Sequence, residues 1–219
     1  MRIPFSREQF AGVFALYNES VWPLQWLLIA LAVIVIMLAV HRTAGTARAA
    51  TVALAAIWLW CGVVYHLEFF SRINPAAKLF GTAFVIEAAL LLWFGFRRPA
   101  PAFSTTGGLE AAAGWALVIY ALVAYPALGY LLGHRYPASP TFGLPCPTTI
   151  FTLGVLLWMV PKPSWRVLAI PLVWALVGTT AAFQLGMLED LGLAASAIIV
   201  LYVMLSQHHA HRLAATPGS

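Results

Sequence analysis

Glu87 is the most informative ionisable residue of the chain because of where it lies. It stands midway along an apolar run of about 79–96. A carboxylate at that depth is costly if it faces lipid, so we expect Glu87 to face a helix bundle and handle a proton or cation there. Its expected polar partners, all on one later apolar run, are Thr179, Thr180 and Gln184. A neutral carboxyl that only hydrogen-bonds within the bundle is the alternative.

A second set of polar residues collects near the ends of other apolar runs. It consists of His66, Glu68, Asn74, His134, Cys146 and Thr148. His66 and Glu68 are two positions apart, so on one helix they point to different faces. His66 and His134 come from different runs, and with Cys146 they offer the nitrogen and sulfur ligands that suit zinc or copper. No tight motif such as H-E-x-x-H occurs, so hydrogen bonding of the two histidines near the membrane interface is the alternative.

Cys146 also has chemistry of its own. Pro147 suits the first position of a helix, which places Cys146 near the N-cap of the run 147–161. The positive end of the helix dipole favours a thiolate there. A metal ligand, a reactive thiol or an anion-binding turn would each fit this position. So would a small residue that fills a proline-rich turn.

Composition identifies the class of protein that must position these residues. Of the 219 residues, 62% are hydrophobic and only 9% are charged, whereas a soluble domain has about 25% charged residues. Such a chain cannot cover a soluble surface with polar groups, which excludes a cytosolic enzyme, a nucleic-acid binder and a disordered chain. The net charge of +5 comes from basic residues between apolar runs, as in the cytoplasmic loops of a membrane protein.

Long apolar runs predict an all-α membrane bundle that forms one domain over 1–219. A helix needs about 20 apolar residues to cross the hydrocarbon core of a bilayer. Seven runs are found, at approximately 21–40, 51–70, 79–96, 111–132, 147–161, 167–187 and 190–206. We therefore expect about seven transmembrane helices. The runs 147–161 and 190–206 are short, so six spans with a re-entrant or displaced segment is the alternative.

The segment 1–20 precedes these runs and differs from them. Ser6-Arg7-Glu8-Gln9 fits a helix-capping box. Phe10, Val13, Phe14 and Tyr17 then follow the spacing of one helical face. We expect a short amphipathic helix that lies in the membrane interface. A helix packed on the rim of its own bundle is the alternative.

Basic residues give the expected orientation in the membrane. Seven lie in the loops after the first, third and fifth runs and in the tail 207–219: Arg42, Arg48, Arg97, Arg98, Lys162, Arg166 and Arg212. Five lie on the opposite side: Arg2, Arg7, Arg72, Lys78 and Arg135. The positive-inside rule therefore predicts a cytoplasmic C-terminal tail and an N-terminus outside.

Three stretches resemble a known family. They are Pro4-Phe5-Ser6 through Val21-Trp22-Pro23, Tyr65-His66 with Ile73-Asn74-Pro75-Ala76-Ala77, and Gly133-His134 through Pro145-Cys146-Pro147-Thr148-Thr149. They are similar to uncharacterised multi-pass membrane proteins of bacteria, a domain-of-unknown-function family with some members labelled permease-like. The resemblance implies a multi-pass protein of a bacterial inner membrane. It supplies no catalytic residues that could be assigned to positions of this chain.

Three functional hypotheses follow, and none requires an enzyme. The first is a small permease or channel for a solute or ion, with Glu87 beside the path. The second is an intramembrane metal-binding protein or metalloenzyme that uses zinc or copper, with its site on the outer face, where the second set of polar residues is expected. The third is an accessory subunit of a larger membrane complex. The lipid bilayer is the expected partner in each case, and nucleic acid is not.

Overall fold

The chain folds into α-helices with one very short β ladder, which confirms the predicted all-α class. The structure is a computed structural model that describes residues 4–42 and 45–215, without the side chains of Ala181 and 207–215. In chain order the elements are α1 (Arg7–Ser20), α2 (Leu24–His41), α3 (Thr46–Trp60), the π-helix η1 (Cys61–Phe69), the 3-10 turn η2 (Phe70–Arg72), α4 (Ala77–Phe96), β1 (Ala102–Phe103), α5 (Gly108–Ile119), the π-helix η3 (Tyr120–Ala124), α6 (Tyr125–Leu131), α7 (Pro145–Leu157), β2 (Met159–Val160), α8 (Trp165–Leu185), the 3-10 turn η4 (Leu188–Asp190) and α9 (Leu191–Ala215).

Six helical segments within the described residues are long and apolar enough to cross a membrane. They are Leu24–His41, Thr46–Arg72, Ala77–Phe96, Gly108–Leu131, Trp165–Leu185 and Leu188–Ser206. The chain is therefore a multi-pass membrane protein with six candidate spans, and the prediction of seven is wrong. The short run 190–206 does reach spanning length, because η4 and α9 join into one helical segment.

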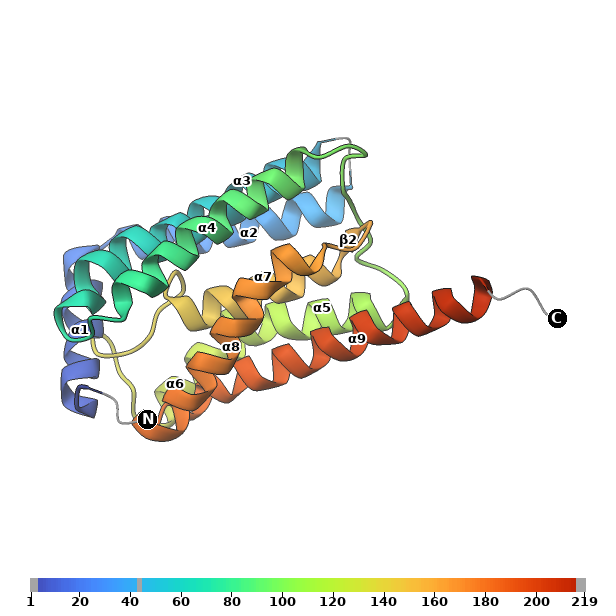
Figure 1. The fold of residues 1–219 in the computed structure, drawn as a ribbon. Helices are drawn as coiled ribbons and strands as arrows, with labels where there is room; N and C mark the ends of the chain where they lie inside the picture. Colours follow the sequence, from blue (N-terminus) through green and yellow to red (C-terminus); the bar gives the residue numbers. More distant parts are fainter. Residues whose placement is uncertain (1–3, 43–44, 216–219) are drawn as a thin grey trace.

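The segment predicted as the fifth span, 147–161, is the short helix α7. It has 13 residues and so extends about 20 Å, against roughly 30 Å for the hydrocarbon core of a bilayer. All its side chains except Cys146 are buried, and it contacts α3, α5, α8 and α9 at the centre of the bundle (Figure 1). Because protein surrounds α7, neither it nor the non-helical segment 137–144 before it must match the bilayer thickness.

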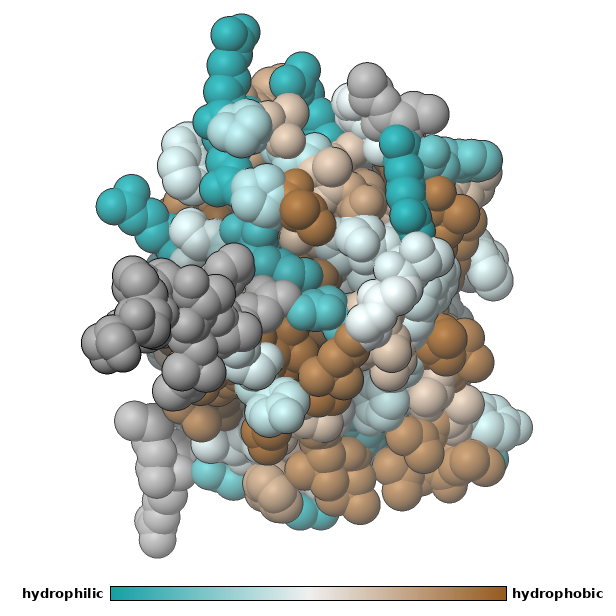
Figure 2. Space-filling view, turned by 90° about the vertical axis from the view of Figure 1, so that its right-hand side faces the viewer, coloured by the Kyte–Doolittle hydropathy of each residue, from teal (hydrophilic) through white to brown (hydrophobic). Residues whose placement is uncertain are grey.

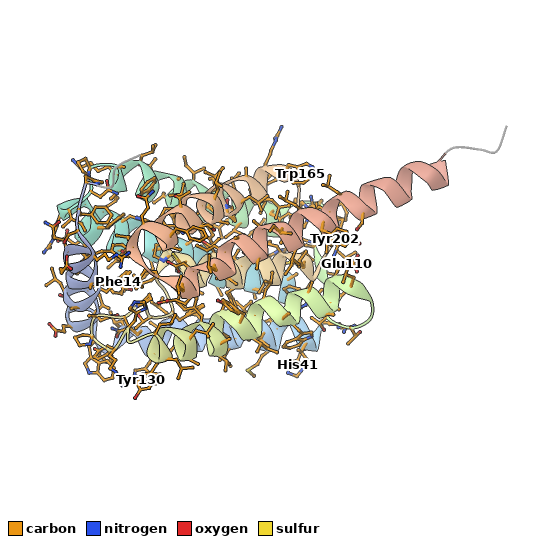
Figure 3. The ribbon with its side chains drawn as sticks, turned by 90° about the horizontal axis from the view of Figure 1, so that it is seen from below. Phe14, His41, Glu110, Tyr130, Trp165 and Tyr202 are labelled. Atoms are coloured by element: carbon orange, nitrogen blue, oxygen red, sulfur yellow. The ribbon has the colours of Figure 1, made fainter. Side chains whose placement is uncertain are left out.

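The helices form two layers with α7 between them. The helices α2, α3 and α4 make up one layer, and α5, α8 and α9 make up the other (Figure 1). Helix α1 lies across one end of the bundle, the α1 end, and the β1–β2 ladder lies at the opposite end, the ladder end. Figure 3 shows Phe14 and Tyr130 at the α1 end and His41 and Glu110 at the ladder end.

Glycines allow close approach at two of the helix contacts. A Cβ atom added to Gly154 of α7 would lie 2.9 Å from the backbone oxygen of Gly114 in α5. A Cβ atom on Gly62 of η1 would lie 2.9 Å from the oxygen of Gly81 in α4. Small residues at such contacts let membrane helices pack backbone against backbone. The contacts therefore hold α7 and η1 closely against their neighbours.

Helix α1 packs on the rim of its own bundle. Its capping box forms as predicted, because Gln9 N donates to Ser6 Oγ (3.2 Å) and Ser6 N donates to Gln9 Oε1 (2.8 Å). Tyr17 is completely buried and its hydroxyl accepts a hydrogen bond from Trp60 Nε1 (2.7 Å). Burial raises the pKa of Tyr17 above its ordinary value. Residues 7–20 therefore pack on the rim of the bundle, while a position of this helix in the membrane interface stays a prediction.

The two ends of the bundle differ in charge. Figure 2 looks onto the ladder end, where hydrophilic side chains gather. Among the described side chains, this end has the basic residues Arg42, Arg48, Arg97, Arg98, Lys162 and Arg166, with Glu110 as its acidic residue. The α1 end has four basic residues, Arg7, Arg72, Lys78 and Arg135, and five acidic residues, Glu8, Glu19, Glu68, Glu189 and Asp190.

Candidate functional site

A cavity of about 420 Å³ opens at the α1 end and is the candidate functional site. It lies among α1, η1, α4, α6, the start of α7, α8 and η4. Aromatic residues are the largest group in its wall: Phe5, Phe10, Phe14, Tyr65, Phe70, Phe80, Tyr125 and Trp174. These rings also contact one another, since the ring centroids of Phe10 and Phe14 are 4.5 Å apart and those of Phe80 and Trp174 are 5.3 Å apart.

The polar part of the cavity wall centres on Asp190. This carboxyl lies at the hairpin between α8 and α9, and its Oδ1 accepts a hydrogen bond of 2.5 Å from the Tyr125 hydroxyl. Asp190 and Tyr125 are both buried. The Cys146 thiol lies beside Asp190 and faces Gly178 of α8, where an added Cβ would be 3.6 Å from the sulfur. Acidic, phenolic and thiol groups therefore share one side of the cavity.

Two π-helical segments position the tyrosines of the cavity. The segment η1 contains Tyr65 and leads into Phe70, and η3 ends immediately before Tyr125. A π-helix adds a residue to the helical turn and frequently occurs at functional sites. Pro126 follows Tyr125, and its missing N–H removes one of the backbone hydrogen bonds that would continue a regular α-helix through this point. Both irregular segments therefore lie at, or directly before, a tyrosine that lines the cavity.

The neighbouring acid, Glu189, is bound into the hairpin rather than into the cavity wall. Its Oε1 lies 2.7 Å from Nδ1 of His134, and its backbone oxygen accepts a hydrogen bond of 2.7 Å from the Tyr120 hydroxyl. Glu189 is completely buried, and its Oε2 has no hydrogen-bond partner among the described residues. His134, which we predicted as a ligand or interfacial donor, therefore serves to hold the α8–α9 hairpin.

His66 lies behind the aromatic wall, and Glu87 lies on α4, seven residues after Phe80. Both are completely buried, which confirms that Glu87 faces the bundle interior. The His66 ring packs between Phe84 and Trp174, with centroid distances of 4.7 and 5.0 Å. Neither ring nitrogen of His66 and neither carboxyl oxygen of Glu87 makes a hydrogen bond within the described part of the chain.

The expected partners of Glu87 do not reach it. The hydroxyls of Thr179 and Thr180 each donate at 2.7 Å to a backbone oxygen of their own helix. Gln184 is exposed and lines the cavity, as does Thr180. Sequence reasoning therefore found two cavity residues on α8, although it assigned them to a different neighbour.

The structure does not bring the predicted metal ligands together. Within the described residues, no group of three or more His, Cys, Asp or Glu side chains is placed to hold a metal ion. His66 is enclosed by aromatic rings, His134 pairs with Glu189, and Cys146 lies in the first turn of α7 at the cavity. The zinc or copper site therefore has no support in the geometry.

The other predicted polar residues have structural contacts. Glu68 is exposed and pairs with Arg72. Asn74 lines the cavity while its Oδ1 accepts from the backbone nitrogen of Ala76 (3.1 Å). Thr148 is completely buried, with its hydroxyl 3.7 Å from the Cys61 sulfur.

Sequence reasoning missed the centre of the polar wall, Asp190 with Tyr125. One signal was present, because Glu189-Asp190 places two of only seven acidic residues in a short turn between two apolar runs. The aromatic wall had no comparable signal. Its rings come from the segment before α1 and from α1, η1, η2, α4, α6 and α8. Aromatic residues near the ends of apolar runs also form the interfacial belt of membrane proteins.

Comparison with known proteins identifies a family and no activity. No curated protein and no solved structure matches the chain. The family match begins in α1, extends into α9 and so includes nearly all the elements around the cavity. Because the match covers residues 7–215, the chain belongs to DUF6064, a family of unknown function.

Proposed function

We propose that this protein binds a small, largely apolar molecule in the cavity at the α1 end. The observation that carries the proposal is the composition of the cavity wall, which combines eight aromatic residues with a few polar groups. Ligand sites in proteins are typically concave and mostly apolar, with volumes of about 300–1,000 Å³. The 420 Å³ cavity lies within that range and suits a molecule of roughly one aromatic ring.

Transport of the bound solute is the second candidate, and His66 and Glu87 favour it. Unpartnered polar groups are costly to bury, and ionisable residues inside membranes commonly mark solute or proton paths. Both residues are completely buried and make no hydrogen bonds within the described part of the chain. A carrier with a second state that opens beside Trp174 would give them polar partners. A permanently open channel has less support, because the buried helix α7 fills the centre of the bundle.

Filling the cavity tests the binding proposal. Val177 lines the cavity, whereas Val173, one turn earlier on α8, is 61% exposed and does not line it. We expect benzyl alcohol to raise the unfolding temperature of the purified protein in a saturable way, since a ligand bound only to the folded state stabilises it. The Val177→Trp variant should lose this shift, and the matched Val173→Trp variant should keep it. Equal shifts in both variants would refute binding in this cavity.

A further inference from the structure

We infer that the cavity prefers an organic cation, an ammonium group carrying a small apolar or aromatic body. The inference rests on the proposed binding function and adds the chemical class of the ligand. It comes from two features of the wall: the single carboxylate side chain of Asp190 and the aromatic rings that line the same cavity. Each feature favours a cation over a neutral molecule of the same shape, and together they favour a cation that carries an apolar or aromatic body.

The charge around the cavity favours a positive ligand. Asp190 is the only Asp, Glu, Lys or Arg side chain that lines it within the described residues, and no His lines it there. The Tyr125 hydroxyl donates to Asp190 and the Cys146 thiol lies beside it, which leaves part of the acceptor capacity of the carboxylate unused. Glu189 adds a second buried carboxyl at the same hairpin. The guanidinium of Arg7 lies beside Gly186 and donates to the backbone oxygen of Gln184 at the end of α8.

The aromatic wall supplies the second half of the recognition. The rings of Tyr65, Phe70, Phe80 and Trp174 line the cavity from η1, η2, α4 and α8. Aromatic faces attract ammonium groups through cation–π interaction, and more strongly where water is excluded. The same rings accept an apolar body, so charge and shape select one amphiphilic class of ligand.

The hydroxyl of Tyr65 strengthens the case. Tyr65 is 3% exposed and lines the cavity, and its hydroxyl makes no hydrogen bond within the described part of the chain. A phenol oxygen is a hydrogen-bond acceptor that an ammonium N–H, or the polarised methyl groups of a quaternary ammonium, is able to approach. Such a ligand would therefore meet two acceptors in the cavity wall, Asp190 and Tyr65.

The test compares two probes of equal shape and different charge. Benzyltrimethylammonium and its neutral carbon isostere, neopentylbenzene, are each titrated against the rate at which N-ethylmaleimide alkylates Cys146, followed by intact mass. Cys146 lines the cavity, whereas Cys61 is completely buried. We expect the cation to protect Cys146 at about tenfold lower concentration than the isostere, because each factor of ten corresponds to about 1.4 kcal/mol of charge-dependent interaction.

Two variants assign the preference to its sources. Asp190→Asn should raise the concentration of the cation needed for protection about tenfold. It should leave the concentration of the isostere needed for protection unchanged, and that unchanged value shows that the cavity of the variant is folded. Glu68→Gln, which removes an exposed carboxylate at the same end, should change neither. If Asp190→Asn does not fold, the Phe80→Leu variant is used to test the inference. It should weaken protection by the cation several-fold more than protection by the isostere.

The outcomes separate the two proposals. Equal protection of the wild-type protein by both probes would overturn the cation preference and leave the binding proposal intact. Protection by neither probe would overturn both proposals. A cation preference that Asp190→Asn and Phe80→Leu both leave unchanged would show that the charge selectivity arises outside this cavity, and it would also refute the inference.

Discussion

Glu87 illustrates what burial without hydrogen bonds means for a single residue. Its carboxyl has no polar partner among the described residues, and it lies in the apolar middle of α4. A buried polar group without a partner costs about 1–3 kcal/mol. A residue of similar volume and no polar oxygen should therefore suit this position better for stability alone.

We predict that Glu87→Met raises the stability of the folded protein. The expected gain is about 1–3 kcal/mol, seen as a higher unfolding temperature in detergent, because the unpaired carboxyl is removed while volume is kept. Glu87→Gln is the control, since it keeps a polar group in the same place and should give little gain. A fall in unfolding temperature for Glu87→Met would mean that the carboxyl has a stabilising role.

For single residues, the sequence predicted whether a side chain is buried better than it predicted which residues that side chain contacts. The apolar surroundings of Glu87 in the sequence were enough to predict that it faces the interior. The contacts of His66, His134 and Cys146 depend on how separate helices rotate against each other, which spacing along one chain does not determine. The pairing of His134 with Glu189 in particular joins two segments 55 residues apart.

At the scale of elements, α7 shows where the length rule for membrane helices stops applying. The rule compares the length of an apolar run with the thickness of the lipid. It does not apply to α7, because this helix is surrounded by α3, α5, α8 and α9 rather than by lipid. Asn18 of α1 fixes the segment before it, since its Nδ2 donates to the backbone oxygens of Pro137 (2.7 Å) and Ser139 (2.8 Å). No local sequence signal relates residue 18 to residues 137–139, so this arrangement required the structure.

Close packing of α5 against α7 gives a prediction for this scale. A methyl group on Gly154 would meet the backbone of Gly114 and the side chain of Leu117 at 2.9 and 3.0 Å. Gly154→Ala should therefore destabilise the protein by about 1–3 kcal/mol through overpacking. Gly12 of α1 is the matched control, because nothing lies within 4 Å of an added Cβ there.

Substitution of glycine by alanine should lower the stability of the protein at position 154 and raise it at position 12. Gly12→Ala should stabilise the protein by roughly 0.5–1 kcal/mol through helix propensity alone. Unfolding temperatures of both variants, measured in the same detergent, make the comparison. Loss of stability at both positions would show that alanine disturbs the fold for a reason other than the α5–α7 contact.

At the scale of the whole molecule, the two ends of the structure differ in charge more clearly than the count of basic residues in the sequence indicated. Among the described side chains, the ladder end has six basic residues and one acidic residue, whereas the α1 end has four basic residues and five acidic residues. Acidic residues contribute little to orientation, but basic residues near the ends of membrane helices favour the cytoplasmic side. The ladder end is therefore expected in the cytoplasm, and the cavity is expected to open on the opposite side of the membrane.

Accessibility of two engineered cysteines tests this orientation in a Cys146→Ser background. Ser20 is exposed at the α1 end, and Ala100 is exposed in the loop between α4 and β1 at the ladder end. A membrane-impermeant maleimide added to intact cells should label Ser20→Cys at once and Ala100→Cys only after permeabilisation. The background chain should stay unlabelled, because its remaining thiol, Cys61, is completely buried. The reverse pattern would place the cavity on the cytoplasmic side, so that any ligand would have to reach it from inside the cell.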